Sequence, residues 1–172
     1  MNVRKAQKAD IDSIEKIYDR IHDSEEQGLS TIGWIRGVYP TRKTAEAALE
    51  RGDLFVMLDD GNVVAAAVIN QTQVYEYKDA AWKYAAEDRE VMVLHCLVVD
   101  PLKGGKGYGR AFVAYYEDYA KQHGCPALRM DTNVKNTRAR KLYHTLGYEE
   151  VGIVQCIFNG IPNVQLVCLE KY

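Results

Sequence analysis

The sequence predicts an α/β (α+β) fold in which about four helices flank a mixed, mostly antiparallel central sheet of about seven strands. Apolar residues recur at helical spacing in some segments and form β-branched, strand-like runs in others. These segments follow one another in the order β-α-α-β-β-β-α-β-α-β-β, which requires helices packed against a sheet. One strand–helix–strand unit stands in the middle, with hairpin signals on both sides, so parallel and antiparallel pairs are both expected.

The bulk composition is that of an ordinary soluble chain. With 172 residues it is long enough to bury a core, and we expect residues 1–172 to form a single domain. The net charge of −2 and pI of about 6.1 give no footprint for nucleic acid or an anionic membrane. We expect no membrane span, no signal peptide and no metal site, and a cytoplasmic protein with reduced thiols. The cysteines, Cys96, Cys125, Cys156 and Cys168, are scattered.

The first third of the chain predicts one strand and two helices. Residues 3–5 form a short strand, and Asp10 then caps a helix. The polar, glycine-containing stretch 23–33 predicts a loop. A second helix is expected over 41–51, where Gly52 stops it. The apolar positions of the first helix are Ile11, Ile14, Ile17, Tyr18 and Ile21.

The middle of the chain predicts three strands. Residues 54–58 and 62–70 are two of them, and the Asp-Asp-Gly turn at 59–61 joins them as a hairpin. Residues 72–89 interrupt the pattern with aromatic and charged side chains. The run 91–99 is almost continuously apolar and β-branched, as in a strand covered on both faces.

The last part of the chain completes the predicted order. Each helix ends at a glycine, and an Asn-Gly pair marks the final turn. The predicted elements are a helix from Tyr108 to His123, a strand over 127–131, a short helix ended by Gly147, and a hairpin of 148–158 and 163–169 across Asn159-Gly160.

The stretch from Val98 to Arg110 is the most informative, because a buried strand there runs into glycines that open an amphipathic helix. The first N–H groups of a helix lack internal partners and carry the positive end of its dipole. Glycines let this backbone approach a ligand closely, so the arrangement favours a pyrophosphate site, with Lys106 and Arg110 adding positive charge. A plain turn is the alternative, but it would not need the helix-destabilising glycines Gly104, Gly105, Gly107 and Gly109.

The glycine spacing narrows the choice of phosphate ligand. The string required for a P-loop is absent, and the dinucleotide fingerprint lacks its third glycine. Asp131, at the end of the next strand, does lie where an acid that binds ribose would fall. A nicotinamide enzyme therefore stays open as an alternative, although hairpins rather than repeated crossovers flank this unit.

Two motifs resemble those of the GNAT superfamily of N-acetyltransferases. The strand 91–99 followed by Pro101 and Gly-Lys-Gly-Tyr-Gly-Arg at 105–110 is similar to its acetyl-CoA loop, R/Q-x-x-G-x-G/A. The second is similar to N-x-x-A-x-x-L-Y-x-x-x-G-F and runs from Asn136 to Tyr148. The sequence departs from the family at Gly104, where an arginine or glutamine is usual.

The resemblance implies a GNAT-like fold that uses acetyl-CoA as acetyl donor, without a metal. The pantetheine arm would pair with the strand at 97–99, the strand from Ala127 would splay away to admit it, and an N–H near Leu97 would polarise the thioester carbonyl. The implied cofactor-binding residues are Leu97, Val98, Val99, Gly104, Gly105, Lys106, Gly107, Tyr108, Gly109, Arg110 and Asn136.

Catalysis needs an acid for the departing thiolate and a base for the amine. The resemblance assigns the acid to Tyr143, although helical spacing alone favours an ordinary core tyrosine. His95 is the candidate base, because its ordinary pKa suits the task and similar strands of arylalkylamine acetyltransferases carry a histidine there. A buried structural histidine is the alternative, and Glu90 is the reserve base. Strand alternation places Cys96 opposite His95, as a core residue.

The sequence therefore predicts acetyl transfer to a primary amine of a small molecule or peptide. The amine would lie among aromatic side chains, which attract ammonium groups, although each could equally be core or lid packing. The alternative is a non-catalytic acyl-CoA-binding sensor of the same fold, and a homodimer is left open as the oligomeric state. The candidate acceptor residues are Trp34, Tyr39, Tyr75 and Trp82.

Overall fold

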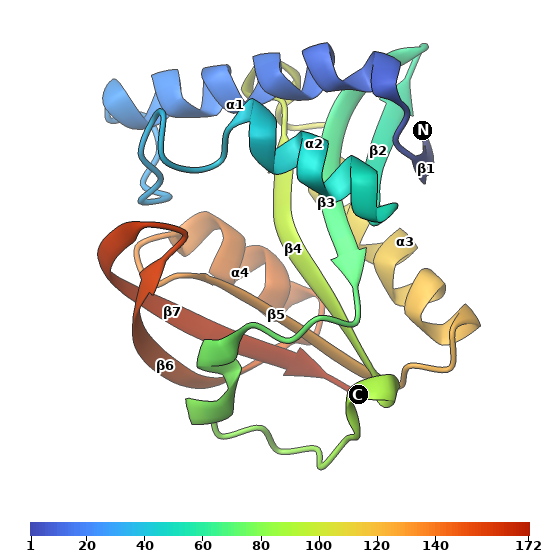
Figure 1. The fold of residues 1–172 in the computed structure, drawn as a ribbon, viewed down its shortest axis with the longest axis vertical. Coiled ribbons are helices and arrows are strands. Elements are labelled where there is room, and N and C mark those ends of the chain that lie inside the picture. Colours follow the sequence, from blue (N-terminus) through green and yellow to red (C-terminus); the bar gives the residue numbers. More distant parts are fainter.

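A computed structural model describes all residues, 1–172, and contains one seven-stranded sheet in the order β1-β2-β3-β4-β5-β7-β6 (Figure 1). Only β4 and β5 are parallel neighbours; all other pairs are antiparallel. The mixed sheet and the element order confirm the predicted fold class. The strands are β1 (Asn2–Lys5), β2 (Leu54–Asp59), β3 (Asn62–Asn70), β4 (Val91–Val99), β5 (Ala127–Asn133), β6 (Glu149–Phe158) and β7 (Ile161–Lys171), and the helices are α1 (Ile11–Glu26), α2 (Arg42–Arg51), α3 (Tyr108–Gln122) and α4 (Thr137–Thr145).

The helices cover both faces of the sheet. Helices α1 and α2 pack on one face, where Leu54 and Val56 of β2 point toward them. The alternating residues Phe55 and Met57 point to the other face, toward α3 and α4. No helix of the chain has the length and apolar character that crossing a membrane requires. All four cysteines are free thiols.

Helix α1 differs from expectation at its start. Asp10 was predicted to cap it, but its carboxylate makes no cap bond to the helix. It accepts the Gln7 N–H at 2.7 Å and a two-bond contact from Arg4 instead. The arginine lowers the pKa of the Asp10 carboxyl. Asp10 therefore fastens the turn between β1 and α1 to Arg4 of β1.

Helix α1 also ends later than expected. The predicted loop over 23–33 begins only after Glu26. The Glu25 carboxylate accepts the N–H groups of Ile32 and Gly33, at 2.7 Å each. This carboxylate folds the following loop back against the last turn of α1, so polar residues there form a helix end rather than open loop.

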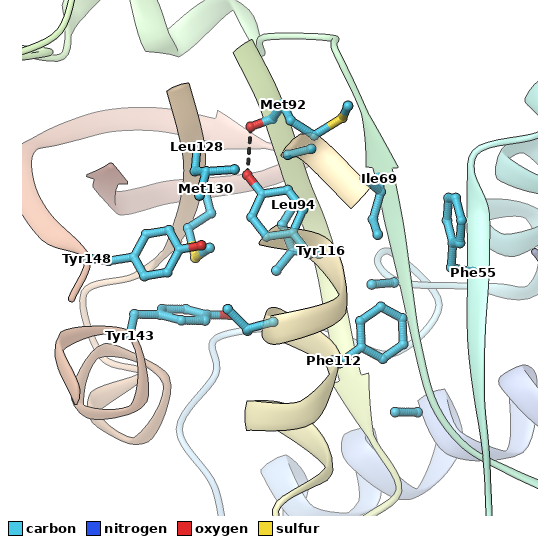
Figure 2. Close-up of a cluster of buried hydrophobic side chains, with 14 of the residues drawn as sticks. Phe55, Ile69, Met92, Leu94, Phe112, Tyr116, Leu128, Met130, Tyr143 and Tyr148 are labelled. Atoms are coloured by element: carbon cyan, nitrogen blue, oxygen red, sulfur yellow. Dashed lines mark hydrogen bonds between the residues drawn. The ribbon is translucent and has the colours of Figure 1, made fainter. Parts of the chain in front are cut away.

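Tyr116 of α3 holds β4 and β5 together at the end where they pair. Its hydroxyl lies 2.6 Å from the carbonyl oxygen of Met92 on β4 and 3.1 Å from that of Arg129 on β5. Figure 2 shows the first of these contacts, with Tyr143 and Tyr148 in the same buried cluster. At this end of the sheet the two strands are therefore fixed to each other and to α3.

Beyond this point β4 and β5 separate. Their parallel register runs only from Val91↔Ala127 to Leu94↔Met130. Beyond Leu94, the second half of β4 has no partner on β5, whereas β5 stays paired with β7 up to Asn133. Figure 1 shows the two strands meeting at one end and diverging toward the other. The sheet is therefore open between β4 and β5.

A β-bulge lies in β4 at the point of divergence. Ala66 of β3 is opposite Val98, but Val68 is opposite His95, so β4 has one extra residue. Cys96 has a φ of 49°, a left-handed conformation that is rare for a residue with a side chain. Cys96 and Leu97 have no register partner on either neighbouring strand.

Candidate active site

The opening between β4 and β5 is a cavity of about 880 Å³. It extends from the glycine loop before α3, along the second half of β4, to the side chains at the end of β5. The remaining walls come from the start of α4, the loop after α1 and the β6–β7 hairpin. Among its lining residues are Trp34, Tyr39, Cys96, Leu97, Val98, Val99, Gly105, Gly107, Arg110, Asp131, Asn136, Arg138, Tyr143 and Phe158.

The glycine loop is open toward the cavity. Gly105 and Gly107 have φ values of 84° and 77°, which glycine adopts without strain. A Cβ atom at either position would meet nothing within 4 Å, so the missing side chains leave free space. Gly107 is also the N-terminal cap residue of α3, which begins at Tyr108. Unpaired backbone N–H groups at the start of a 15-residue helix therefore face an open space.

Gly109 has a different role, because a side chain there would collide. Its Cβ would lie 3.3 Å from Leu142 Cδ2 and 3.9 Å from Val99 Cγ2. The glycine therefore lets α3 pack closely against α4 and β4, which brings Leu142 and its neighbours on α4 to the cavity.

Two arginines bring positive charge to this end of the cavity. Arg110 lies in the first turn of α3, and Arg138 in the first turn of α4. Neither side chain has a hydrogen-bond or ion-pair partner within the chain. Together with the dipole of α3 they make this end suitable for an anion, which fits the phosphate groups that the sequence predicted.

Helix α4 positions Asn136 and Tyr143 at the cavity. The Asn136 side-chain oxygen accepts the Ala139 N–H at 3.2 Å and so caps the helix; the residue lines the cavity, and its NH₂ group has no partner within the chain. Two turns later Tyr143 lies on the same wall, almost fully buried. Burial, with Asp131 and Cys96 nearby, raises the pKa of its phenol well above the ordinary value, so it stays protonated.

Cys96 also faces the cavity, contrary to the expected alternation. The bulge adds a residue to β4, so the Cys96 side chain does not alternate to the face opposite His95. It packs on the α1–α2 face of the sheet, together with Val68, which is the register partner of His95. Leu97 packs with the α3–α4 side. Burial raises the pKa of the Cys96 thiol to about 11, so it is a neutral thiol at pH 7.

Asp131, which the sequence suggested only as a ribose-binding acid of the nicotinamide alternative, lies at this site. It is the first residue of β5 beyond the parallel pairing, and its side chain lines the cavity. Its Oδ2 accepts the Tyr77 hydroxyl at 2.8 Å, and its Oδ1 has no partner within the chain. Burial raises the pKa of Asp131 to about 6, although the hydrogen bond from Tyr77 acts to lower it. The available signal was a single acid directly after the short strand-like segment Ala-Leu-Arg-Met at 127–130.

The sequence profile of the Acetyltransferase (GNAT) family matches residues 14–148. The chain belongs to this family of acetyltransferases. The uncharacterized N-acetyltransferase YhfO of Bacillus subtilis is 27% identical over 161 residues, which cover 92% of this chain and 97% of that protein.

Solved GNAT structures share the fold. A GNAT-family acetyltransferase from Streptococcus agalactiae matches with a TM-score of 0.81 and 22% identity over 99% of this chain and 94% of that one. YncA from Salmonella typhimurium, a putative acetyltransferase whose structure contains acetyl-CoA, matches with a TM-score of 0.69 and 19% identity over 99% and 92%. At these identities the likeness concerns the fold.

Within the GNAT fold, three predicted polar residues lie outside the cavity. The His95 ring bonds to Asn70 Oδ1 at 3.0 Å, away from the cavity. Burial lowers the pKa of His95 to about 4. Glu90 bonds to the Glu87 N–H at the far end of β4, and Lys106 of the glycine loop does not line the cavity. The bulge explains why the His95 side chain points away from the cavity. In a regular strand, His95 and Leu97 would lie on the same face of the sheet.

The structure divides the aromatic residues that were predicted for the acceptor end of this GNAT domain. Trp34 and Tyr39 line the cavity, and Phe158, which sequence reasoning missed, stands beside Tyr39 at 5.3 Å between ring centroids. Tyr75 is exposed next to Lys78, outside the cavity. Trp82 does not line the cavity; it packs against Tyr77 at 5.0 Å between ring centroids and lies 4.2 Å from the Arg129 guanidinium.

Proposed function

We propose that this chain is an acetyl-CoA-dependent N-acetyltransferase that transfers the acetyl group directly to a primary amine of a small molecule or peptide. The observation that carries the proposal is the continuous cavity from the glycine loop to Tyr143 and Asp131. An anion-binding helix start and a protonated phenol share this cavity, as a coenzyme with phosphates at one end and sulfur at the other requires.

The phosphate end of acetyl-CoA would bind at the start of α3. The backbone at Gly105 and Gly107 is open, and the arginines Arg110 and Arg138 have no other partner. A phosphate group accepts bonds from helix N–H groups and from guanidinium groups, and both kinds of donor are available here. The acetyl-CoA in the similar YncA structure supports this choice of coenzyme.

The pantetheine arm would lie in the opening of the sheet. The half of β4 at 97–99 has lost its partner on β5, so its backbone can pair with the amides of an extended ligand instead. Asn136 lines the same space at the start of α4, and its NH₂ group is available to an amide of the ligand. In this position the Leu97 N–H, directly after the bulge, would polarise the carbonyl of the acetyl group.

Acetyl-CoA would supply an acetyl group activated as a thioester. In the balanced reaction, the acceptor nitrogen gains a bond to the acetyl carbon, the bond from this carbon to sulfur breaks, and the ammonium form of the acceptor loses two protons. One proton goes to a base and then to solvent. The other ends on the sulfur, and Tyr143 is the residue positioned to deliver it, because burial keeps its phenol protonated.

Two measurements test the proposed function. Calorimetry with CoA and with NADPH should show binding of CoA only, and release of free thiol should follow when acetyl-CoA is mixed with a panel of primary amines. Absence of CoA binding at millimolar concentration would refute the assignment, and preferential binding of NADPH would support a nicotinamide enzyme. CoA binding without thiol release from any amine would support a non-catalytic acyl-CoA sensor.

A further inference from the structure

The charges that line the cavity are divided between its two ends. Arg110 and Arg138 lie at the phosphate end. Asp100 also lines the cavity, but its carboxylate is paired with Arg20 at 2.6 Å. The one charged lining residue left is Asp131, at the other end and without a cationic partner. This end of the cavity therefore has a negative charge that nothing in the chain neutralises.

The Asp131 carboxylate is directed by the fold rather than by a counter-ion. The Tyr77 hydroxyl donates to Oδ2 at 2.8 Å, which fixes the carboxylate and leaves Oδ1 free. Tyr77 is itself buried and held among apolar residues of β4, β5 and β6. Asp131 is half-buried, and a carboxylate partly withdrawn from water is costly without a cation, so a site that retains one favours a positively charged ligand.

The other titratable groups around Asp131 do not provide that cation. Burial raises the pKa of each neighbouring phenol and thiol, so all of them are neutral at pH 7, and Glu76 adds a second carboxylate. Arg129, two residues earlier on β5, donates to Gln73 Oε1 and to the Tyr84 carbonyl and makes no bond to Asp131. The neighbours are Tyr39, Tyr77, Tyr143, Cys96, Cys156, Cys168 and Glu76. A cation must therefore come from the ligand.

The walls beside Asp131 are apolar and aromatic. Tyr39 packs edge-to-face against Trp34 at 5.6 Å and against Phe158 at 5.3 Å between ring centroids. Val164 and Leu166 of β7 continue the same wall. No lysine, arginine or histidine lines this end, so a carboxylate on the ligand would find no partner and would meet the charge of Asp131.

We propose that Asp131 binds the ammonium group of the acceptor and accepts its proton, and that the acceptors are primary amines on an apolar or aromatic body without a carboxylate. This inference rests on the proposed function. The proton transfer converts R–NH₃⁺ and the carboxylate into R–NH₂ and the carboxylic acid, so the nitrogen lone pair becomes free to attack the acetyl group. The carboxylic acid then releases its proton to solvent.

Three matched probes test the selectivity: 2-phenylethylamine, phenylalanine and 2-phenylethanol. Calorimetry in the presence of CoA, where no turnover occurs, measures binding alone. We expect 2-phenylethylamine to bind at least tenfold more tightly than the other two, because only it offers an ammonium group without a carboxylate. Acetylation rates with acetyl-CoA should follow the same order.

The variant Asp131→Asn tests the residue itself. It should weaken 2-phenylethylamine at least tenfold, leave 2-phenylethanol and CoA unchanged, and lower the acetylation rate. Unchanged amine binding in the variant, equal binding of the three probes, or no binding of 2-phenylethylamine would overturn the inference. Amine binding that depends on Asp131 without turnover of any amine would instead contradict the proposed function; it would support ammonium binding by Asp131 and overturn its role as proton acceptor.

Discussion

The Nη2 atom of Arg138 lies 4.0 Å from the point where a Cβ atom on Gly104 would stand. Gly104 is the position at which related acetyl-CoA loops usually have an arginine or glutamine. Arg138 belongs to α4, yet its guanidinium reaches the space where that side chain would begin. A positive charge at the place of the side chain that position 104 lacks is therefore brought in from a second element.

Replacing Arg138 by alanine should weaken CoA binding. A charge-assisted hydrogen bond contributes about 1.5–3 kcal/mol, so we expect the Kd for CoA to rise roughly tenfold to a hundredfold in calorimetry. Lys141→Ala is the matched control, because it removes a positive charge from the same helix outside the main cavity. An equal rise of the Kd for CoA in both variants would show that the overall positive charge of α4, and not a contact of Arg138, attracts the coenzyme.

The same relationship predicts a rescue. Gly104 has φ −56° and ψ 161°, a conformation open to any residue, and a Cβ there would make only ordinary contacts. Gly104→Gln should therefore fold normally and restore part of the CoA affinity lost in Arg138→Ala. A double variant no tighter than Arg138→Ala alone would mean that the two positions do not serve the same group.

Gly107→Ala should separate the cost of backbone strain from the loss of a binding site. Gly107 and Gly124 stand at opposite ends of α3 with φ values of 77° and 70°, and neither would bring a Cβ within 4 Å of another atom. Alanine at either position should therefore cost about 1–2 kcal/mol in the free energy of unfolding. Only Gly107→Ala should also raise the Kd for CoA, because its methyl group would enter the phosphate space. Equal CoA affinities in the two variants would contradict the phosphate site.

Tyr143→Phe should lower kcat and leave the Kd for CoA nearly unchanged. Loss of a general acid costs roughly a hundredfold to ten-thousandfold in rate. Tyr148→Phe is the control, because its hydroxyl is buried in the same cluster without a partner and does not line the cavity. The rate of thiol release from acetyl-CoA at saturating amine would give kcat for both variants. Similar kcat values for Tyr143→Phe and the unchanged protein would remove Tyr143 from the acid role.

The fold was predictable because periodicity and turn residues are local. The hairpin across Asn159-Gly160 and the stop of α2 at Gly52 depend on residues adjacent in sequence, and both occur as predicted. Asp10 was misplaced because its partner, Arg4, is brought near by tertiary structure. Local patterns therefore gave the elements, and side-chain partners decided how they begin and end.

The candidate site was predictable only in part, because two of its features arise from tertiary structure. The glycine loop and the α4 motif are contiguous in sequence, and the structure brings both to the cavity. The bulge at Cys96 is not visible in an apolar strand, so alternation gave the wrong faces for residues after His95. The role of Asp131 depends on the separation of β4 from β5 and on Tyr77, which is 54 residues away in sequence. Neither relationship is encoded by spacing.

The stability of the protein should depend on the charge of Asp131. Its pKa is about 6 in the folded state and 3.8 in the unfolded chain, so protonation favours folding. The associated stability is fully present below pH 3.8 and is lost as the pH rises through about 6. At pH 7.5, Asp131→Asn should therefore raise the free energy of unfolding, by up to about 3 kcal/mol.

This gain should shrink toward zero at pH 4 in urea denaturation, because asparagine keeps an oxygen for Tyr77 and changes only the charge. Asp118→Asn, at an exposed position on α3, is the control and should show no such pH dependence. A lower stability of Asp131→Asn at pH 7.5 would mean that the carboxylate has a stabilising cation in the folded state.

The acidic limb of the rate profile should distinguish the two candidate bases. A base works only when deprotonated, so kcat/KM falls as the pH drops through its pKa. Burial sets the pKa of Asp131 to about 6 and that of His95 to about 4, and we expect a limb near 6. Asp131→Asn should abolish this limb and His95→Gln should leave it in place. Tyr77→Phe should move it to higher pH, because the carboxylate loses the hydroxyl that favours its charged form. A limb near 4 that disappears in His95→Gln would transfer the role to the histidine, and would require β4 to rearrange at its bulge before the amine could reach it.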